Sequence, residues 1–453
     1  MVVGQRGESC SNGDRIWGWG RLGNAVGCML RATYSPGMSE ADKMTISAEM
    51  TVSADRSHAN LDQGSLCRQS HGVGKEEPCG TIFKEAINQL NFHNGAINTT
   101  LRSRIPGISR SFALDQINLF PEIRYMGSKK RLLPWIHDIL EGLDFETALD
   151  PFSGSGAVAY LMKAMGRQTV SSDFLNFSAT LGKALIENNT VHLDGPTIQF
   201  LLSTPENTTS FIEDTFKGVF YNPEDLQFLD RISWNIRRLG NPHQRALAMA
   251  VLIRSCAKRQ PRGVFTISGN LAKYDDGRRD LQLSIEEHFF EQVRVFNEAV
   301  FSNNCHNRTE CIDVFKVSAS DINLVYLDPP YVPRHDDNCY VKRYHFLEGL
   351  SCYWQGLDID YSTKVRKIPK RFTPFSYRRQ AVDAFTCLFR RFQNSKIVLS
   401  YSSNGYPDLD QLTEILAKTK RNIQVFKRDH IYHFGNHHNV KRTAVEEYLI
   451  VGQ

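Results

Sequence analysis

The sequence predicts an α/β fold built on a doubly wound sheet, and three observations support this prediction. From residue 119 onward, short apolar strand segments alternate with helical segments. A glycine turn, Asp150-Pro151-Phe152-Ser153-Gly154-Ser155-Gly156, joins the first of these strands to a helix. An Asp-Pro-Pro-Tyr motif directly follows a later apolar strand. Such sheets bind ligands at the carboxyl ends of their strands, so both motifs lie where a site is expected.

The predicted elements alternate in type at the start of this region and resume after an interruption. The first half holds a helix over 129–143, a strand over 146–149, a helix over 157–165, a strand over 168–172 and a helix over 177–188. Residues 191–310 break the alternation with helices over 244–258 and 285–301, and indicate an inserted helical subdomain. Further strands are predicted over 323–327, 396–401 and 444–451. Residues 1–118 lack apolar periodicity, and we expect them to be mostly disordered or accessory.

Composition excludes several classes of protein. The chain has 453 residues, a formal net charge of +5 and 41% hydrophobic residues, which is ordinary for a globular protein and permits a nucleic-acid partner. No run of about 20 apolar residues is present, so no membrane span is predicted. The ten cysteines form no CxxC pair and His437-His438 has no partner at ligand spacing, so we predict neither a disulfide scaffold nor a metal site. Without a secretory signal, the expected location is the cytoplasm.

The segment Asp328-Pro329-Pro330-Tyr331 is the most specific motif in the chain. Proline fixes φ and has no N–H, so the segment is rigid and presents mainly hydrogen-bond acceptors. Asp328 and the carbonyl of Pro329 can both accept from one amino group, and Tyr331 offers a face for a planar ring. This arrangement suits the exocyclic amino group of a heterocycle such as adenine. Two acceptors draw that nitrogen towards tetrahedral geometry and free its lone pair.

The glycine turn admits two interpretations. Gly154-x-Gly156-x-x-Ala159 fits the fingerprint of dinucleotide-binding proteins. Asp150 argues against a dinucleotide, because a carboxylate just before the turn repels a pyrophosphate at the helix N-terminus. The same carboxylate favours a ligand with an ammonium group, such as S-adenosylmethionine (AdoMet). Asp173, at the end of the next strand, is placed either to hold ribose hydroxyls or to cap a helix.

Four motifs occur in a characteristic order: RYMGSK at 124–129, DPFSGSG at 150–156, the strand-end Asp173, and DPPY at 328–331. Over residues 119–453 this combination resembles the Dam-type adenine-specific DNA methyltransferases of the alpha order, in which the AdoMet motif precedes the catalytic motif. The resemblance implies a Rossmann-like, seven-stranded mixed sheet. It also implies an AdoMet-binding half at 119–190, a target-recognition insertion at 191–310 and a catalytic half at 311–453.

The resemblance assigns a role to each matched residue. It implies that Asp328, Pro329, Pro330 and Tyr331 are catalytic, and that Ser400–Asn404 shapes the target-base pocket. It implies an AdoMet site made of Tyr125, Lys129, Asp150, Phe152, Gly154, Gly156, Asp173 and Asp313. In this set Asp173 would hold the ribose, and Asp313, a looser match, would lie near the adenine of AdoMet.

Basic and aromatic residues around the motifs leave alternatives open. Basic clusters at 254–262, 278–279, 334–343 and 364–371 are each typical of a solvated face, yet together they fit phosphate contacts along a duplex. The aromatic residues that follow the DPPY motif fit either a flipped-base pocket or the core; they are Tyr340, Tyr344, Phe346, Tyr353 and Trp354.

The expected function is site-specific transfer of a methyl group from AdoMet to the exocyclic amino group of adenine in double-stranded DNA. The alternatives are an enzyme acting on adenine in RNA, a dinucleotide-dependent oxidoreductase and a DNA-binding module with an inactive site. A monomer suffices for this reaction. A restriction endonuclease acting independently on the same sites is a compatible companion.

Overall fold

The computed structural model describes residues 110–453 except 208, 262, 269–276, 333–338 and 433–442. The predicted accessory segment up to residue 109 and the pair His437-His438 therefore lie outside the described residues. The last residues of that predicted segment form helix α2 (Arg110–Leu119), which buries Ala113 and Ile117 and packs on α4 and α11.

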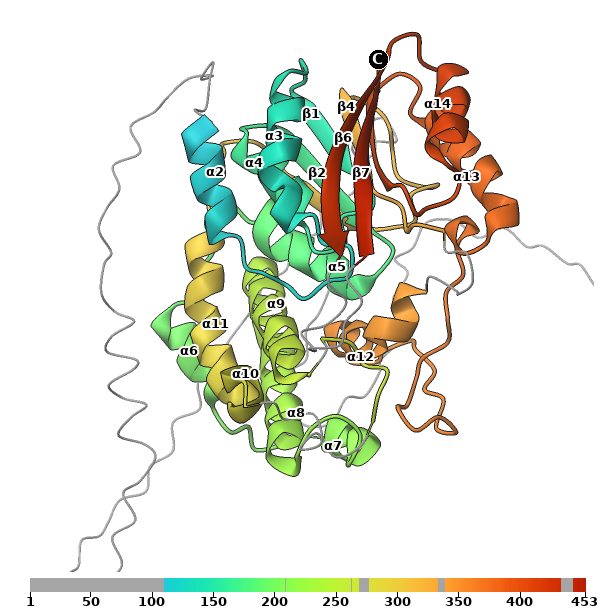
Figure 1. Cartoon of the computed structure of the whole chain (residues 1–453). Coiled ribbons are helices and arrows are strands. Elements are labelled where there is room, and N and C mark those ends of the chain that lie inside the picture. Colours follow the sequence, from blue (N-terminus) through green and yellow to red (C-terminus); the bar gives the residue numbers. More distant parts are fainter. Residues whose placement is uncertain (1–109, 208, 262, 269–276, 333–338, 433–442) are drawn as a thin grey trace, which may run out of the picture. The chain divides into compact units, whose positions relative to one another are not determined.

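A seven-stranded mixed sheet lies at the centre of the fold, in the order β3-β2-β1-β4-β5-β7-β6 (Figure 1). The five strands from β3 to β5 are parallel, and β7 runs antiparallel to both of its neighbours. The predicted fold class is confirmed. The strands are β1 (Thr147–Asp150), β2 (Gln168–Asp173), β3 (Arg308–Cys311), β4 (Leu324–Leu327), β5 (Lys396–Ser402), β6 (Ile423–Tyr432) and β7 (Thr443–Gly452).

Two of these strands, β3 and β6, were not predicted from the sequence. Both lie at the edges of the sheet. The sequence of β3 is Arg-Thr-Glu-Cys, and β6 contains Lys427, Arg428 and Asp429. An edge strand faces water along one side, so it can carry charged residues and lose the apolar alternation that identifies a half-buried strand.

Side chains from alternate strand positions enter two separate cores. In β4, Leu324 and Tyr326 pack into the larger core with α3 (Leu133–Glu141), α4 (Ala157–Ala164) and α5 (Asn176–Gly182). Val325 and Leu327 point into the second core, which contains α13 (Arg378–Arg391) and α14 (Leu409–Ala417). Helices therefore cover both faces of the sheet, as a doubly wound topology requires.

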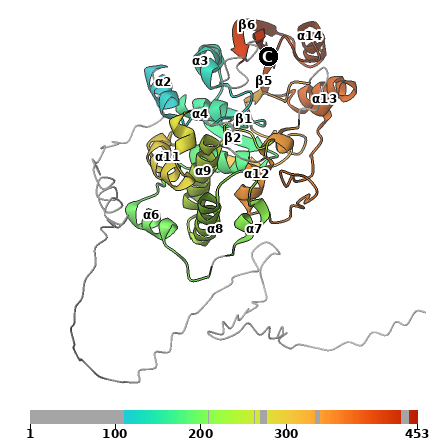
Figure 2. The ribbon, with the colours of Figure 1, turned by 60° about the horizontal axis from the view of Figure 1, so that its bottom comes forward.

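A group of helices lies between β2 and β3 in the sequence and interrupts the succession of strands along the chain, as predicted (Figure 2). Helix α9, the longest of the group, is buried along most of its length and packs against α8 and α11. Side-chain caps begin several of these helices: Asp194, Asn222, Asn241 and Ser284 each accept a bond from a backbone N–H in the first turn. The group comprises α6 (Gly195–Leu202), α7 (Phe211–Phe216), α8 (Pro223–Arg238), α9 (Pro242–Arg259), α10 (Arg279–Gln282) and α11 (Ile285–Ala299).

Two predicted helices divide into shorter pieces. The helix expected over 129–143 begins as the 3-10 turn η1 (Lys130–Leu132) and continues as α3, in which Pro134 occupies the first turn. The helix expected over 177–188 becomes α5 followed by the π-helical turn η2 (Lys183–Glu187). The remaining elements are α12 (Tyr340–Cys352) and the 3-10 turn η4 (Pro374–Ser376).

Helices long and apolar enough to cross a membrane are absent from the described part of the chain.

Candidate active site

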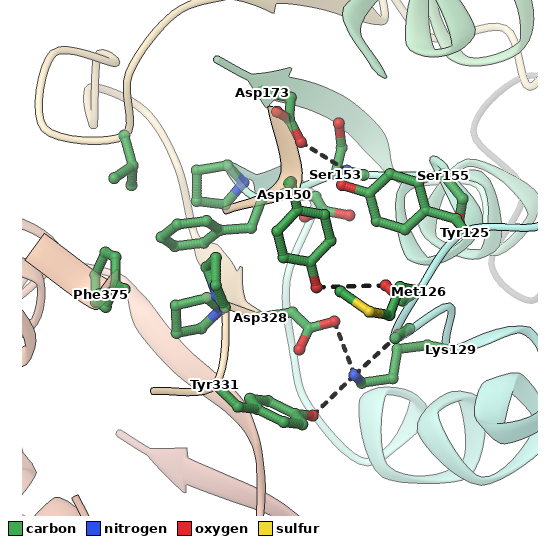
Figure 3. Close-up of a pocket in the computed structure, with 18 of the residues that line it drawn as sticks. Tyr125, Met126, Lys129, Asp150, Ser153, Ser155, Asp173, Asp328, Tyr331 and Phe375 are labelled. Carbon is green, nitrogen blue, oxygen red and sulfur yellow. Dashed lines mark hydrogen bonds and ion pairs between the residues drawn. The ribbon is translucent and has the colours of Figure 1, made fainter. Parts of the chain in front are cut away.

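A cavity of about 640 Å³ lies at the carboxyl ends of the parallel strands (Figure 3). This volume is typical of sites for small molecules and cofactors. Of the predicted site residues, the cavity is lined by Tyr125, Lys129, Asp150, Phe152, Gly154, Asp173, Asp313, Asp328, Pro329, Pro330 and Tyr331. Gly156 does not line it; this residue has φ +83° and caps the start of α4. The topology thus brings together motifs that lie far apart in the sequence.

The glycine turn is shaped by contacts with its neighbours. Gly154 has φ +50°, and a Cβ added there would lie 2.8 Å from the ring of Tyr125. The Gly154 N–H donates to Oδ2 of Asp173 at 2.9 Å, which ties the end of β1 to the end of β2. Any larger residue at position 154 would displace Tyr125 from the cavity wall.

Asp150 is a buried carboxylate at the end of β1, with 2% of its surface exposed. Its Oδ1 atom has no hydrogen-bond partner. Burial, and secondarily the charge of Asp328, hold the pKa of Asp150 well above its usual value. A buried carboxylate without a counter-ion costs free energy, so a cationic ligand group in the cavity would relieve this cost.

Asp173 faces the cavity, and backbone N–H groups hold its carboxylate in place. Oδ1 accepts from the N–H of Leu175 at 2.9 Å, while Oδ2 accepts from Gly154. Burial raises the pKa of Asp173 to about 7, and these two bonds oppose the rise. Asp173 does not cap α5, whose N-cap residue is Leu175 and which has no side-chain cap. Each oxygen of the Asp173 carboxylate can accept a further bond, so the ribose interpretation remains a prediction.

Aromatic rings form one wall of the cavity. Tyr125 stacks on Tyr344, with ring centroids 5.3 Å apart, and on Tyr340 at 5.5 Å. The Tyr344 hydroxyl accepts from the N–H of Met126 at 2.7 Å. Tyr340 lines the cavity, whereas Tyr344, Phe346 and Trp354 are buried in the larger core. The structure therefore supports the core interpretation for these three residues.

The Asp-Pro-Pro-Tyr segment leaves the end of β4 and faces the cavity from the side opposite Tyr125 (Figure 3). The Tyr331 ring packs edge-on against Tyr401 of β5, with centroids 4.9 Å apart. The hydroxyl of Tyr401 accepts from the N–H of Val332 at 3.4 Å. Strand β5 thus supports the motif, and Ser403 and Asn404, just beyond β5, also line the cavity.

Lys129, predicted as part of the cofactor site, points its ammonium group at the Asp-Pro-Pro-Tyr motif instead of along the glycine turn. Its Nζ lies 2.9 Å from Oδ2 of Asp328 and donates to the Tyr331 hydroxyl at 2.9 Å and to the Gly127 carbonyl at 3.3 Å. Only 5% of Lys129 is exposed. The buried ion pair fixes the Asp328 carboxylate in one orientation.

Sequence reasoning missed Glu447, which is fully buried on β7 and accepts from the Tyr331 hydroxyl at 3.0 Å. Along β7, Glu447 is in phase with Val445, Leu449 and Val451, all buried. A carboxylate at a buried position costs free energy unless it has a partner. A glutamate in phase with the apolar residues of β7 was therefore the sequence feature that could have pointed to this site. Phe375, which packs edge-on against Phe152, was also missed.

Several described side chains of the basic clusters at 254–262 and 278–279 are paired within the protein, although Arg279 remains exposed. Lys258 pairs with Asp280 at 2.8 Å, and Arg259 pairs with Asp225 at 3.2 Å. Arg278 donates to the Pro261 carbonyl. These side chains hold the helical region together and are less available for phosphates than their charge indicates. Arg343, in contrast, lines the cavity.

One cluster of metal-type side chains occurs among the described residues, on α3: His137, Asp138 and Glu141. None of the three lines the cavity. The guanidinium group of Arg110 already forms an ion pair with the Asp138 carboxylate, at 2.8 Å.

The raised pKa of the Asp328 carboxyl leads us to expect that activity depends on pH. Burial raises its pKa to about 6, while Lys129 opposes the rise. Only the ionised Asp328 carboxylate can accept hydrogen bonds through both oxygens without donating one. We therefore expect kcat/KM for AdoMet to rise with pH and to become constant above about pH 6. Below this value it should fall about tenfold per pH unit for one group, and faster if Asp173, with a pKa of about 7, must also ionise. Steady-state rates between about pH 5 and 8 check this, and a rate that stays constant down to about pH 5 would contradict it.

The fold and cavity define the class of protein. A seven-stranded sheet in this order, with one antiparallel strand and a glycine turn after β1, is the fold of the AdoMet-dependent methyltransferases. The profile of the D12 class N6 adenine-specific DNA methyltransferases matches residues 125–355, which include all four motifs except Arg124, the first residue of RYMGSK. The chain belongs to this family and is an adenine-specific DNA methyltransferase. The predicted function is confirmed at this level, and the RNA and oxidoreductase alternatives are set aside.

Known relatives agree with this assignment. The chain is 30% identical to the Type II methyltransferase M2.HphI of Haemophilus parahaemolyticus over 73% of this chain and 98% of that protein. It is 26% identical to the modification methylase StsI of Streptococcus sanguinis, over 65% of this chain and 46% of that protein. It is 25% identical to the Type II methyltransferase M.FokI of Planomicrobium okeanokoites, over 72% of this chain and 52% of that protein. The chain spans about half the length of the last two relatives.

Proposed function

We propose that this enzyme takes its methyl group from AdoMet and transfers it to the exocyclic amino group of adenine within a specific sequence of double-stranded DNA. We also propose that it is of the Dam type and alpha order. The observation that carries the proposal is the convergence of two motifs on one cavity: the glycine turn at 150–156 and the catalytic segment at 328–331. Their order in the chain, with a helical region between them, supports the alpha order.

The residues around the glycine turn fit AdoMet. Asp150, whose Oδ1 has no partner, would accept from the ammonium group, and Asp173 would accept from the ribose hydroxyls. Tyr125 and Phe152 form apolar walls, and Asp313, after β3, would lie near the adenine of AdoMet. When bound, AdoMet supplies a methyl group made electrophilic by a sulfonium centre.

The catalytic segment would hold the target base. The adenine must leave the base stack to reach the cavity. Its amino group would donate to the Asp328 carboxylate and to the Pro329 carbonyl, while its ring stacks on Tyr331. Lys129 already donates to Oδ2 of Asp328, so the amino group would share or replace that contact. Two fixed acceptors stabilise positive charge as it develops on the amino nitrogen.

Duplex recognition is the proposed role of residues 191–310, together with basic residues that follow the catalytic segment in the chain. Arg343 lines the cavity, and Lys364 and Lys370 are exposed. The curated relatives are named Type II methyltransferases or modification methylases, which supports a restriction–modification role beside a separate endonuclease. We propose that the enzyme acts as a monomer on one strand at a time.

Transfer of tritiated methyl from AdoMet to unmethylated DNA tests the proposed function directly. After digestion and nucleoside chromatography, the label should be found in N6-methyl-2′-deoxyadenosine. Sequencing of the product then gives the recognition site. Binding of AdoMet without label in DNA would overturn the substrate assignment. Absence of AdoMet binding would overturn the proposed roles of Asp150 and the glycine turn.

A further inference from the structure

Glu447 is a buried carboxylate that the reaction outlined above does not use. It lies on β7, where antiparallel pairing sets it opposite Ser402 at the carboxyl end of β5. Leu327 of β4 pairs with Leu399 of β5, three residues before Ser402, and Tyr331 follows four residues after Leu327. The antiparallel strand β7 therefore places the Glu447 carboxylate beside the catalytic segment.

The hydrogen-bond directions around Tyr331 are fixed by chemistry. An ammonium group only donates, so the Tyr331 hydroxyl accepts from Lys129 at 2.9 Å. The hydroxyl proton is then directed at Oε2 of Glu447, 3.0 Å away. Lys129 also pairs with Asp328. A continuous chain of contacts therefore runs from Glu447 through Tyr331 and Lys129 to the catalytic carboxylate.

We infer that Glu447 is a positioning residue for methyl transfer: it fixes the Tyr331 side chain and, through its hydroxyl, holds the Lys129 ammonium beside Asp328. The inference rests on the proposed function, in which Tyr331 stacks on the target adenine and Asp328 accepts from its amino group. Without Glu447, the Tyr331 hydroxyl has lost the acceptor at 3.0 Å, and its proton can turn towards another acceptor such as the Asp328 carboxylate. The ring and Lys129 would then sample several positions, and transfer would slow because few of them match the reactive geometry.

The charge of Glu447 gives a second, independent readout. The groups that face Asp328 are Lys129, Tyr331, Glu447 and, across the cavity floor, Asp150 and Tyr326. Burial is the main cause of the raised pKa of Asp328, and the charge of Glu447 adds to it. Removing its charge should therefore move the acid limb of the rate profile to lower pH. A residue that only packed in the sheet would leave the limb in place.

The test compares four variants in the tritium assay: Glu447→Ala, Glu447→Gln, Tyr331→Phe and the double variant Tyr331→Phe/Glu447→Ala. We expect Glu447→Ala to lower kcat about tenfold to a hundredfold with KM for AdoMet nearly unchanged. Glu447→Gln keeps a carbonyl acceptor, so it should retain most of the rate and show the acid limb at lower pH. The double variant should be no slower than Tyr331→Phe, because both changes remove the same contact.

The controls separate the possible failures. Glu446→Gln changes the neighbouring acid on β7, which accepts from Tyr448 at 3.2 Å, and should leave the rate unchanged. Melting temperatures show whether Glu447→Ala folds; if it does not, Glu447→Gln and its pH profile carry the test. Wild-type kcat in Glu447→Ala, or a double variant slower than Tyr331→Phe by the full Glu447→Ala factor, would overturn the inference. Absence of transfer by the unaltered enzyme would instead overturn the proposed function, and this inference with it.

Discussion

Replacement of Asp328 by alanine is expected to lower methyl transfer about 10²–10³-fold, the usual cost of removing one group that stabilises developing charge. Asp328 holds one of the two acceptors proposed for the adenine amino group, and its carboxylate also anchors Lys129 at 2.9 Å. The ammonium keeps its contacts with Tyr331 and Gly127, so the cavity should retain its shape. AdoMet affinity is expected to change less than about tenfold.

Single-turnover transfer of tritiated methyl, together with calorimetric titration of AdoMet, separates these two effects. Asp383→Asn is a matched control, because Asp383 lies exposed on α13 and outside the cavity. Equal losses of rate and AdoMet affinity in Asp328→Ala would contradict the division between a catalytic segment and a cofactor site.

Replacement of Asp150 by asparagine is expected to weaken AdoMet binding about 10²–10³-fold, or about 3–4 kcal/mol, which lies within the cost of losing one partner of a buried ion pair. The free enzyme should melt at the same or a higher temperature. Asp150 is buried, its Oδ1 lacks a partner and its pKa is raised well above the usual value, so ionisation of this group opposes folding at neutral pH. Binding and stability should therefore change in opposite directions.

The pH dependence of melting gives the sign of this effect. A carboxyl with a raised folded-state pKa stabilises the fold below its unfolded pKa, near about 4, and this contribution is lost as pH rises towards the folded value. The unaltered enzyme should lose stability over this range, and Asp150→Asn should lose less. Thermal scans with and without AdoMet check both points. A lower melting temperature for free Asp150→Asn, with AdoMet still raising it as in the unaltered enzyme, would reject the proposed role.

Most of the sheet could be predicted from local patterns in the sequence. Strands β1, β4 and β5 were predictable because each contains a short, mainly apolar run bounded by a turn or a motif residue. Strand β2 was predictable from its place between a helix that ends at a glycine and the strand-end Asp173, and β7 from its apolar end. Once those strands are parallel and adjacent, the motifs that follow them meet at one edge of the sheet. The convergence of Asp150, Asp173 and Asp328 on one cavity therefore follows from local patterns together with a general rule of topology.

Other features depend on partners that are distant in sequence. Lys258 and Arg259 resembled a phosphate-binding cluster, but Asp280 and Asp225 neutralise them. Stacking on Tyr125 decides that Tyr344 belongs to the core. No local pattern contains these pairings, because periodicity reports which face of an element is buried and not which residue covers it.

The fold class, the chemistry of the catalytic segment and the residues at the strand ends could be predicted from the sequence, because they depend on short-range pattern and on the intrinsic properties of proline, glycine and carboxylates. The contacts of Lys129 with Asp328 and of Glu447 with Tyr331 became visible only in the folded chain. Both contacts join segments more than a hundred residues apart, and the second depends on the antiparallel direction of β7. Strand order and direction fix such contacts, and they are properties of the assembled sheet.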